Sequence, residues 1–368
     1  MRQTRWAAPG GPTYTFEYHS GALRVVVVAG RTLLVGMYCS GEGFQRVDLR
    51  DASTGEVVDV HGFGDKEWWH DPAGHFTCFT ARGGTFVLHI TGRPRGYRVL
   101  RVTRDGFEVV GHVVPGLLGD DMFVEAVAPA VFCGRSAILA LGFDGSSRTV
   151  ASFRAAWDGD RVLGCWNIPR GWKCSRLVAA GERTYAWLRP RPPDATSPEE
   201  PWRVTVEHGC LLWDVTSDRP VGRPLPVPGP DHGIWDLNGR PVALFGADRQ
   251  VWDPARREPL GPGLGDVDLA NPRVGTMRGR PVIAGTTQQS LRVWDIGTAR
   301  LLGSTDLPDA PIATAIDPDG TAWAITRTGY VGTLTLGFAE VHPSTARRSL
   351  RRGGGARGAR EAWGGNRQ

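Results

Sequence analysis

The chain has 368 residues and a formal net charge of +5. Residues 343–368 hold seven arginines against one glutamate, so the rest of the chain is close to neutral. The positive net charge therefore comes from the tail, and it does not indicate that the body of the chain binds nucleic acid. No run approaches the ~20 apolar residues that a membrane-spanning helix needs, so no such helix is expected.

Residues 1–11, MRQTRWAAPGG, lack the apolar core of a signal peptide, and we therefore expect a cytoplasmic protein. The six cysteines form no Cys-x-x-Cys pair, which favours buried thiols in strands over disulfides. His61, His70 and His75 lie near several acids, but they lack the paired spacing of metal ligands. Neither a metal nor a cofactor is expected.

The composition is typical of an all-β protein, because 50 glycines and 27 prolines punctuate many turns and 14 tryptophans supply large packing groups. Residues 290–336 show the pattern most clearly, with strand-like runs of 4–7 residues separated by tight turns such as DPDG. Such short connections leave no room for crossover helices. They predict antiparallel sheet.

This pattern recurs along the chain, which indicates a repeat protein. Three segments carry Trp-Asp at a strand end: LLWDVTSDRPVG (211–222), QVWDPARREPLG (250–261) and RVWDIGTARLLG (292–303). In each, a glycine follows the tryptophan by nine residues. Looser copies occur at 47–58, 102–111 and 155–164. In the second half the copies recur about every forty residues, the length of a four-stranded blade.

These motifs resemble those of the WD-repeat family of β-propellers, over residues 12–336 and most clearly over 205–336. The resemblance implies a seven-bladed propeller of four-stranded antiparallel blades. The family's Gly-His dipeptide occurs once, at Gly74-His75, so stability should rest more on apolar packing than on a polar network. The blades are expected at about 23–60, 75–113, 123–166, 175–225, 233–261, 272–305 and 312–336.

The last of these blades has only three strands of its own. Residues 12–18, PTYTFEY, alternate apolar and polar side chains and belong to no other blade. We expect this segment to pair beside residues 330–336 and close the ring, because an open blade would expose a sheet edge. Residues 337–368 are Gly- and Arg-rich and lack periodicity, which predicts a disordered tail.

With strands a to d in each blade, the d–a and b–c loops share one face of a propeller, the d–a face, and the a–b and c–d loops share the a–b face. The expected d–a loops hold three basic residues, Lys66, Arg170 and Lys173. They hold ten acidic ones: Asp65, Glu67, Asp71, Asp120, Asp121, Asp231, Asp266, Asp268, Asp306 and Asp309. An acidic d–a face favours a basic partner. The alternative is that these aspartates only cap turns.

Three tryptophans lie in the same set of loops: Trp68, Trp69 and Trp172. Exposed tryptophans are frequent interface anchors, although these could instead fold back and cover the blade edge. The Pro-rich insert at 189–201 is either a docking segment or a tolerated surface loop. The candidate partner-binding residues are Trp68, Trp69, Asp71, Asp120, Asp121, Trp172, Asp231, Asp266 and Asp268.

The function expected from these features is a non-catalytic scaffold that binds a protein partner. The first alternative is a hydrolase or lyase with a site in the central channel, which requires histidine, acidic or arginine side chains on the innermost strands. Most of these strands look too apolar for that. The second alternative is nucleic-acid binding through the Arg-rich residues 347–360.

Overall fold

The structure is a computed structural model. It describes residues 18–40, 45–63, 76–81, 84–91, 96–113, 123–132, 135–143, 149–155, 162–169, 172–190, 209–226, 231–317, 320–328 and 330–336. All of these lie in a compact unit, Met1–Leu336, and the second unit, Gly337–Gln368, lies outside the described residues. The expected disordered tail is therefore a prediction on which the structure gives no information.

The described strands form seven antiparallel sheets, here numbered sheet 1 to sheet 7 in chain order. Sheet 1 holds β1 (Tyr18–Val28), β2 (Arg31–Ser40), β3 (Gln45–Asp51) and β4 (Val57–Phe63). Sheet 2 holds β5 (Phe76–Ala81), β6 (Gly84–Thr91), β7 (Gly96–Val102) and β8 (Phe107–Val113). Sheet 3 holds β9 (Phe123–Phe132), β10 (Arg135–Phe143), β11 (Thr149–Ala155) and β12 (Val162–Asn167).

Sheets 4 to 6 repeat the arrangement. Sheet 4 holds β13 (Trp172–Ala180), β14 (Arg183–Pro190), β15 (Leu211–Asp214) and β16 (Arg219–Pro220). Sheet 5 holds β17 (Asp231–Leu237), β18 (Arg240–Phe245), β19 (Gln250–Asp253) and β20 (Glu258–Pro259). Sheet 6 holds β21 (Ala270–Met277), β22 (Arg280–Thr287), β23 (Ser290–Asp295) and β24 (Leu301–Asp306). Sheet 7 holds β25 (Pro311–Asp317), β26 (Thr321–Thr326) and β27 (Val331–Thr335).

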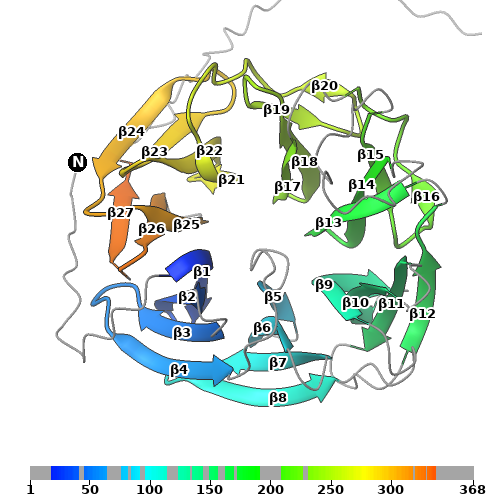
Figure 1. Cartoon of the computed structure of the whole chain (residues 1–368), viewed down its shortest axis with the longest axis horizontal. Coiled ribbons are helices and arrows are strands. Elements are labelled where there is room, and N and C mark those ends of the chain that lie inside the picture. The colour runs from blue at the N-terminus through cyan, green and yellow to red at the C-terminus, as the bar shows by residue number, and fades with distance from the viewer. Residues whose placement is uncertain are drawn as a thin grey trace, which may run out of the picture. The chain divides into compact units, whose positions relative to one another are not determined.

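The first strand of every sheet lies innermost, and the innermost strands follow one another around a common axis (Figure 1). Each of β1, β5, β9, β13, β17 and β21 contacts the innermost strand of the next sheet, and β25 contacts β1. This arrangement is a β-propeller, as the repeats predict. Among the described residues, no helix is long and apolar enough to cross a membrane.

The prediction of seven four-stranded blades is wrong, because the described strands form six complete blades and sheet 7 has three strands. The strand expected at 12–18 is not seen beside β27. Residues 12–17 lie outside the described residues, and Tyr18 starts β1, where it pairs with Ser40.

In the described residues, side-chain packing joins the first and last sheets. Leu23 and Leu34 of sheet 1 form one apolar cluster with Ile312, Trp323 and Ile325 of sheet 7. Ile325 is fully buried there, and Trp323 is 7% exposed. Removal of this apolar surface from water favours closure of the ring.

A charged pair repeats at the end of the third strand in four sheets. Asp51, Asp214, Asp253 and Asp295 are all buried, and each is the last residue of its strand. One carboxylate oxygen accepts hydrogen bonds from the turn that follows, as where Asp214 Oδ1 accepts from the backbone N–H groups of Thr216 and Ser217 at 3.0 and 3.1 Å. The carboxylate thus caps the c–d turn.

The other carboxylate oxygen faces an arginine that begins the second strand. Arg31 Nε lies 2.5 Å from Asp51 Oδ2, Arg183 Nη1 lies 2.8 Å from Asp214 Oδ2, and Arg240 Nη1 lies 3.9 Å from Asp253 Oδ2. Arg280 Nε donates in the same way to Asp295. Each pair joins the a–b turn to the c–d turn of one blade.

The a–b turns place these arginines by their own geometry. In sheets 1, 5 and 6 the two turn residues both have positive φ, as at Asn238 (54°) and Gly239 (79°). Such two-residue turns match the twist of the flanking strands and fix their register. Leu237 then pairs with Arg240 across the turn, which sets the arginine at the first position of β18.

The contribution of this pair to the stability of the fold can be tested at Asp295. Burial alone would raise the pKa of the Asp295 carboxyl, but hydrogen bonds from Thr298 and Arg280 lower it below its ordinary value. A lowered pKa in the folded state means that the charged form stabilises the fold above the unfolded pKa of about 3.9, and that this stability is lost as the pH falls. We expect Asp295→Asn to lower the free energy of unfolding by about 1–3 kcal/mol at neutral pH.

Denaturant unfolding at neutral pH and near pH 3 measures this effect, and the difference from wild type should shrink at the lower pH. Asp105→Asn is the matched control, because Asp105 is exposed in the corresponding turn of sheet 2 and its carboxylate has no described partner. An equal loss in both variants would show that the pair contributes nothing specific.

Ring closure can be tested at Ile325. We expect Ile325→Ala to cost about 2–5 kcal/mol, because it leaves a cavity between sheets 1 and 7. Val27→Ala in β1, where the side chain is 57% exposed, should change the free energy of unfolding by less than about 0.5 kcal/mol. Similar losses in the two variants, measured by thermal or denaturant unfolding, would contradict closure by this cluster.

Candidate functional site

The described part of the d–a face carries an acidic loop cluster, which we define as Asp248, Asp266 and Asp268. Asp266 and Asp268 lie in the loop from β20 to β21, and Asp248 lies in the turn from β18 to β19. The backbone joins the two segments, because Gly265 N donates to Asp248 O at 3.1 Å. All three side chains belong to exposed residues, and none forms an ion pair within the described structure.

A glycine allows this close approach. A Cβ at Gly263 would lie 2.6 Å from Asp248 Oδ2 and 2.8 Å from the Asp248 carbonyl oxygen, so only glycine fits at this contact. Arg249, the neighbouring base, is half-buried and donates from Nη1 to the Ala247 carbonyl at 3.2 Å. The cluster therefore presents three exposed carboxylates, and the one base next to it in the sequence is partly buried.

Asp231 is on the same face but is not available to a partner. Its side chain is 4% exposed, and Arg189 pairs with it from the end of β14. Trp187 Nε1 donates to Asp231 Oδ2 at 3.0 Å, and Gly233 N donates to Asp231 Oδ1 at 2.8 Å. Asp231 thus joins sheet 4 to sheet 5.

Asp309 is also held within the fold. Its Oδ2 accepts from Thr326 Oγ1 at 3.0 Å and from Thr328 Oγ1, so the carboxylate ties the loop before β25 to the turn after β26. Asp306 ends β24 and is exposed. The acids of the described d–a face therefore divide into structural ones, Asp231 and Asp309, and exposed ones, the acidic loop cluster and Asp306.

Trp172 is half-buried at the start of β13. Its ring packs against the apolar cluster between sheets 3 and 4, which includes Trp166, Cys174 and Leu188. Its backbone N–H donates to the Pro169 carbonyl at 3.1 Å. This placement fits a side chain that covers the blade edge.

Several candidates lie outside the described residues. These are Trp68, Trp69, Asp71, Asp120 and Asp121, together with residues 191–201 of the Pro-rich insert. Their expected roles stay predictions.

Of the three histidines that lie near acids in the sequence, the structure describes only His61, which lies in β4. His61 Nε2 is 3.2 Å from Arg98 Nη1. Burial lowers the pKa of His61, and the positive charge of Arg98 lowers it further. Within the described residues, no group of three histidine, cysteine or acidic side chains could hold a metal ion.

The innermost strands carry charge that the sequence interpretation missed. Arg24 of β1, Arg176 of β13 and Arg273 of β21 are half-buried residues of these strands, and we call them the axial arginines. The expectation that inner strands are mostly apolar overlooks them, because each is flanked by valine, leucine, serine or proline. Aligning the strands on their a–b turns would have shown that they occupy one register position.

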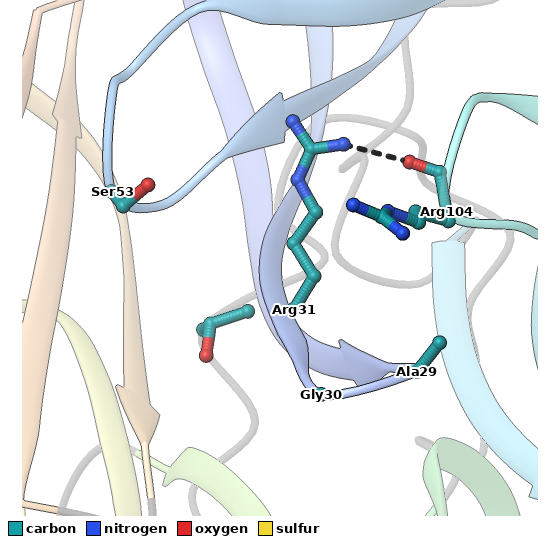
Figure 2. Close-up of a pocket in the computed structure, with 6 residues that line it drawn as sticks. Ala29, Gly30, Arg31, Ser53 and Arg104 are labelled. Carbon is teal, nitrogen blue, oxygen red and sulfur yellow. Dashed lines mark hydrogen bonds between the residues drawn. The ribbon is translucent and has the colours of Figure 1, made fainter.

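The a–b face has a shallow pocket of about 500 Å³ between sheets 1 and 2, lined by Ala29, Gly30, Arg31, Thr32, Ser53 and Arg104 (Figure 2). Arg31 Nη1 donates to the Arg104 carbonyl at 3.0 Å, and Arg31 Nε is held by Asp51. The pocket is lined by cations, hydroxyls and backbone, and it contains no paired acid and base for proton transfer.

No protein-family model matches the chain, and no curated protein matches it. Solved structures of similar fold include the WD40 domain of Pan2 from Neurospora crassa, with a TM-score of 0.56, 11% identity, and coverage of 92% of this chain and 94% of that domain. BamB from Moraxella catarrhalis matches with a TM-score of 0.44 and 12% identity, over 86% of this chain and 84% of that one. At such identities the likeness shows the fold alone.

Asp231 and Asp268 should differ in their effect on stability. Asp231→Ala leaves the fully buried Trp187 indole N–H without its acceptor and Arg189 without its partner, so we expect a loss of about 1–3 kcal/mol in the free energy of unfolding. Asp268→Ala removes an exposed carboxylate and should cost less than about 0.5 kcal/mol. Denaturant unfolding of the two variants checks this, and an unchanged Asp231→Ala protein would contradict the structural role.

Proposed function

From its WD-repeat-like β-propeller fold, we propose that this chain is a non-catalytic scaffold that binds a basic protein partner on its d–a face. The observation that carries the proposal is the acidic loop cluster, in which two loops bring three exposed aspartates together without a described ion pair. A concentration of like charge on a rigid surface attracts a partner of the opposite charge and speeds its encounter.

The rigidity of the surface supports the same function. Gly263 and Gly265 hold the β20–β21 loop against the Asp248 turn, and both segments rest on sheet 5, whose Leu237, Val242 and Leu244 form a packed core with sheet 6. A preformed surface loses little conformational freedom on binding, which favours affinity. The predicted tryptophans at 68 and 69 belong to the same face in this proposal and would supply apolar anchors.

The exposed aspartates of the acidic loop cluster have little effect on the stability of the fold. Exposed carboxylates without a partner contribute little to stability, whereas the buried Asp51, Asp214, Asp253 and Asp295 each hold a turn and face an arginine. The scaffold proposal explains why acids gather in this loop cluster. The cytoplasmic location and the nucleic-acid role of the tail stay predictions.

The test uses quantitative affinity capture from native cell extract, followed by binding kinetics with the captured protein in purified form. We expect the double variant Asp266→Lys/Asp268→Lys to lower the association rate at low salt by about tenfold or more, because it reverses the local field. Higher salt should reduce the difference in association rate between the wild type and the double variant.

The control is Asp105→Lys/Glu182→Lys, which makes the same charge change at two exposed positions of the a–b face. A partner that binds all three proteins equally would contradict the assignment to the acidic loop cluster. A parallel Trp68→Ala/Trp69→Ala variant tests the apolar anchors. Failure to capture any protein would contradict the scaffold proposal itself.

A further inference from the structure

The pocket of Figure 2, lined by residues 29–32, 53 and 104 and here called the a–b pocket, lies where sheets 1 and 2 meet. Arg31 begins β2, and Arg104 lies in the turn from β7 to β8. Arg31 Nη1 donates to the Arg104 carbonyl at 3.0 Å, and Phe107 N, directly after this turn, donates to Asp59 Oδ2 of sheet 1 at 2.8 Å. Two hydrogen bonds thus join the two walls of the pocket. A site with preformed walls loses little conformational freedom when it binds a ligand.

Arg31 presents its guanidinium in a fixed position. Its Nε lies 2.5 Å from Asp51 Oδ2, and Asp51 Oδ1 accepts from the backbone N–H and the hydroxyl of Ser53 at 2.6 and 2.5 Å. Burial alone would raise the pKa of the Asp51 carboxyl, but hydrogen bonds from Ser53 and Arg31 lower it well below its ordinary value. The carboxylate therefore stays charged, and both of its oxygens are used within sheet 1. Arg31 keeps Nη2, which makes no described hydrogen bond, as a donor for a ligand.

The Arg104 side chain is not needed by its own turn. In sheet 2, the Thr103 hydroxyl holds the turn, because it donates to the Gly106 carbonyl at 2.8 Å and accepts from the Asp105 backbone N–H at 3.3 Å. Arg104 is exposed, and its guanidinium makes no hydrogen bond or ion pair with the residues that the structure describes. Figure 2 shows this side chain directed from its turn toward Arg31. All of its N–H groups are therefore available to a ligand.

The lining of the a–b pocket is rich in donors and contains no carboxylate, since none of its six residues is acidic. Asp105 follows Arg104 in the turn, but it is not a lining residue, and its carboxylate forms no described ion pair with either arginine. A Cβ at Gly30 would meet no atom within 4 Å, so the pocket is open above this turn. An open pocket with two guanidinium groups and no acid in its lining favours an anionic ligand.

We propose that the a–b pocket binds a carboxylate, either that of a small organic acid or that of a peptide C-terminus. Arg104 donates two parallel hydrogen bonds to the carboxylate oxygens, and Arg31 donates a third from Nη2. Asp51 neutralises Arg31, so the lining keeps one unmatched positive charge, which a monoanion balances. The volume of about 500 Å³ is larger than a carboxylate group, so the pocket also admits part of the body of the ligand. This site lies on the a–b face and does not depend on the acidic loop cluster of the d–a face.

An NMR titration of the full chain with N-acetylglycine at constant ionic strength tests the site. We expect saturable shifts of the backbone amide resonances of Gly30 and Arg104. N-acetylglycinamide has the same shape without the charge, and it should leave these resonances unchanged. Inorganic phosphate at the same ionic strength should bind no more tightly than N-acetylglycine, because only one positive charge of the lining is unmatched.

Substitution of Arg104 tests the residue that supplies this charge. We expect Arg104→Gln to weaken the binding of N-acetylglycine by about tenfold or more, because it removes a charge-assisted pair of hydrogen bonds. Arg104→Lys keeps the charge but loses the planar fork, so its affinity should lie between those of wild type and Arg104→Gln. Thermal unfolding should show wild-type stability in both variants, since the Arg104 side chain has no described partner.

The control is Arg300→Gln, which removes one positive charge at an exposed turn of the a–b face, where only the Arg300 backbone makes described hydrogen bonds. Its affinity for N-acetylglycine should equal that of wild type. An equal loss of affinity in Arg300→Gln and Arg104→Gln would show that only the general charge of this face matters, which would overturn the site.

A second titration, with N-acetyl-triglycine, distinguishes the two sources of the carboxylate. Tighter binding than that of N-acetylglycine indicates a peptide C-terminus, and equal or weaker binding indicates a small organic acid. Three further results would overturn the proposal: no shift at Gly30 and Arg104 with N-acetylglycine, equal shifts with the amide, and unchanged affinity in Arg104→Gln. Tighter binding of inorganic phosphate would contradict the choice of a carboxylate.

Discussion

The pairing of a buried aspartate with an arginine at one end of four blades is the interaction on which the described fold most depends. Each blade is a meander whose two turns on the a–b face would otherwise be held only by their own hydrogen bonds. In sheet 6, Asp295 caps the c–d turn through Thr298 and holds Arg280 of the a–b turn. The buried carboxylate is tolerated because every oxygen has a donor, which offsets its desolvation.

The sequence predicted one half of this interaction and missed the other. The Trp-Asp motif identified Asp214, Asp253 and Asp295 because the dipeptide recurs with a glycine at constant spacing. The arginines were not identified, since Arg183 lies 31 residues from Asp214 and only the antiparallel pairing of β14 with β15 brings them together. Sheet 2 departs from the motif because it has Thr103 where the other four sheets have aspartate. The Thr103 hydroxyl donates to the Gly106 carbonyl at 2.8 Å and so holds the turn in a different way.

The candidate site was less predictable than the fold, again because it depends on contacts between residues that are distant in sequence. Loop membership follows from strand order, so the position of Asp266 and Asp268 on the d–a face could be inferred from local patterns. Whether an aspartate is free or structural depends on a partner distant in sequence, such as Arg189, which lies 42 residues from Asp231. Asp248 was missed because it lies in a b–c turn, although such turns share the face. Closure of the ring through Ile325 and Leu23 depends on contacts between the two ends of the repeat array.

The described arginines take part in two kinds of contact, one within a blade and one between blades. At the a–b turns, Arg31, Arg183 and Arg280 face carboxylates of their own blades, so these charges are neutralised as the blade forms. On the innermost strands, Arg273 instead donates from Nε to the Thr314 carbonyl of the next blade, at 3.2 Å. The turn arginines thus stabilise single blades, because each joins two turns of one sheet, whereas Arg273 joins two neighbouring blades through a backbone carbonyl.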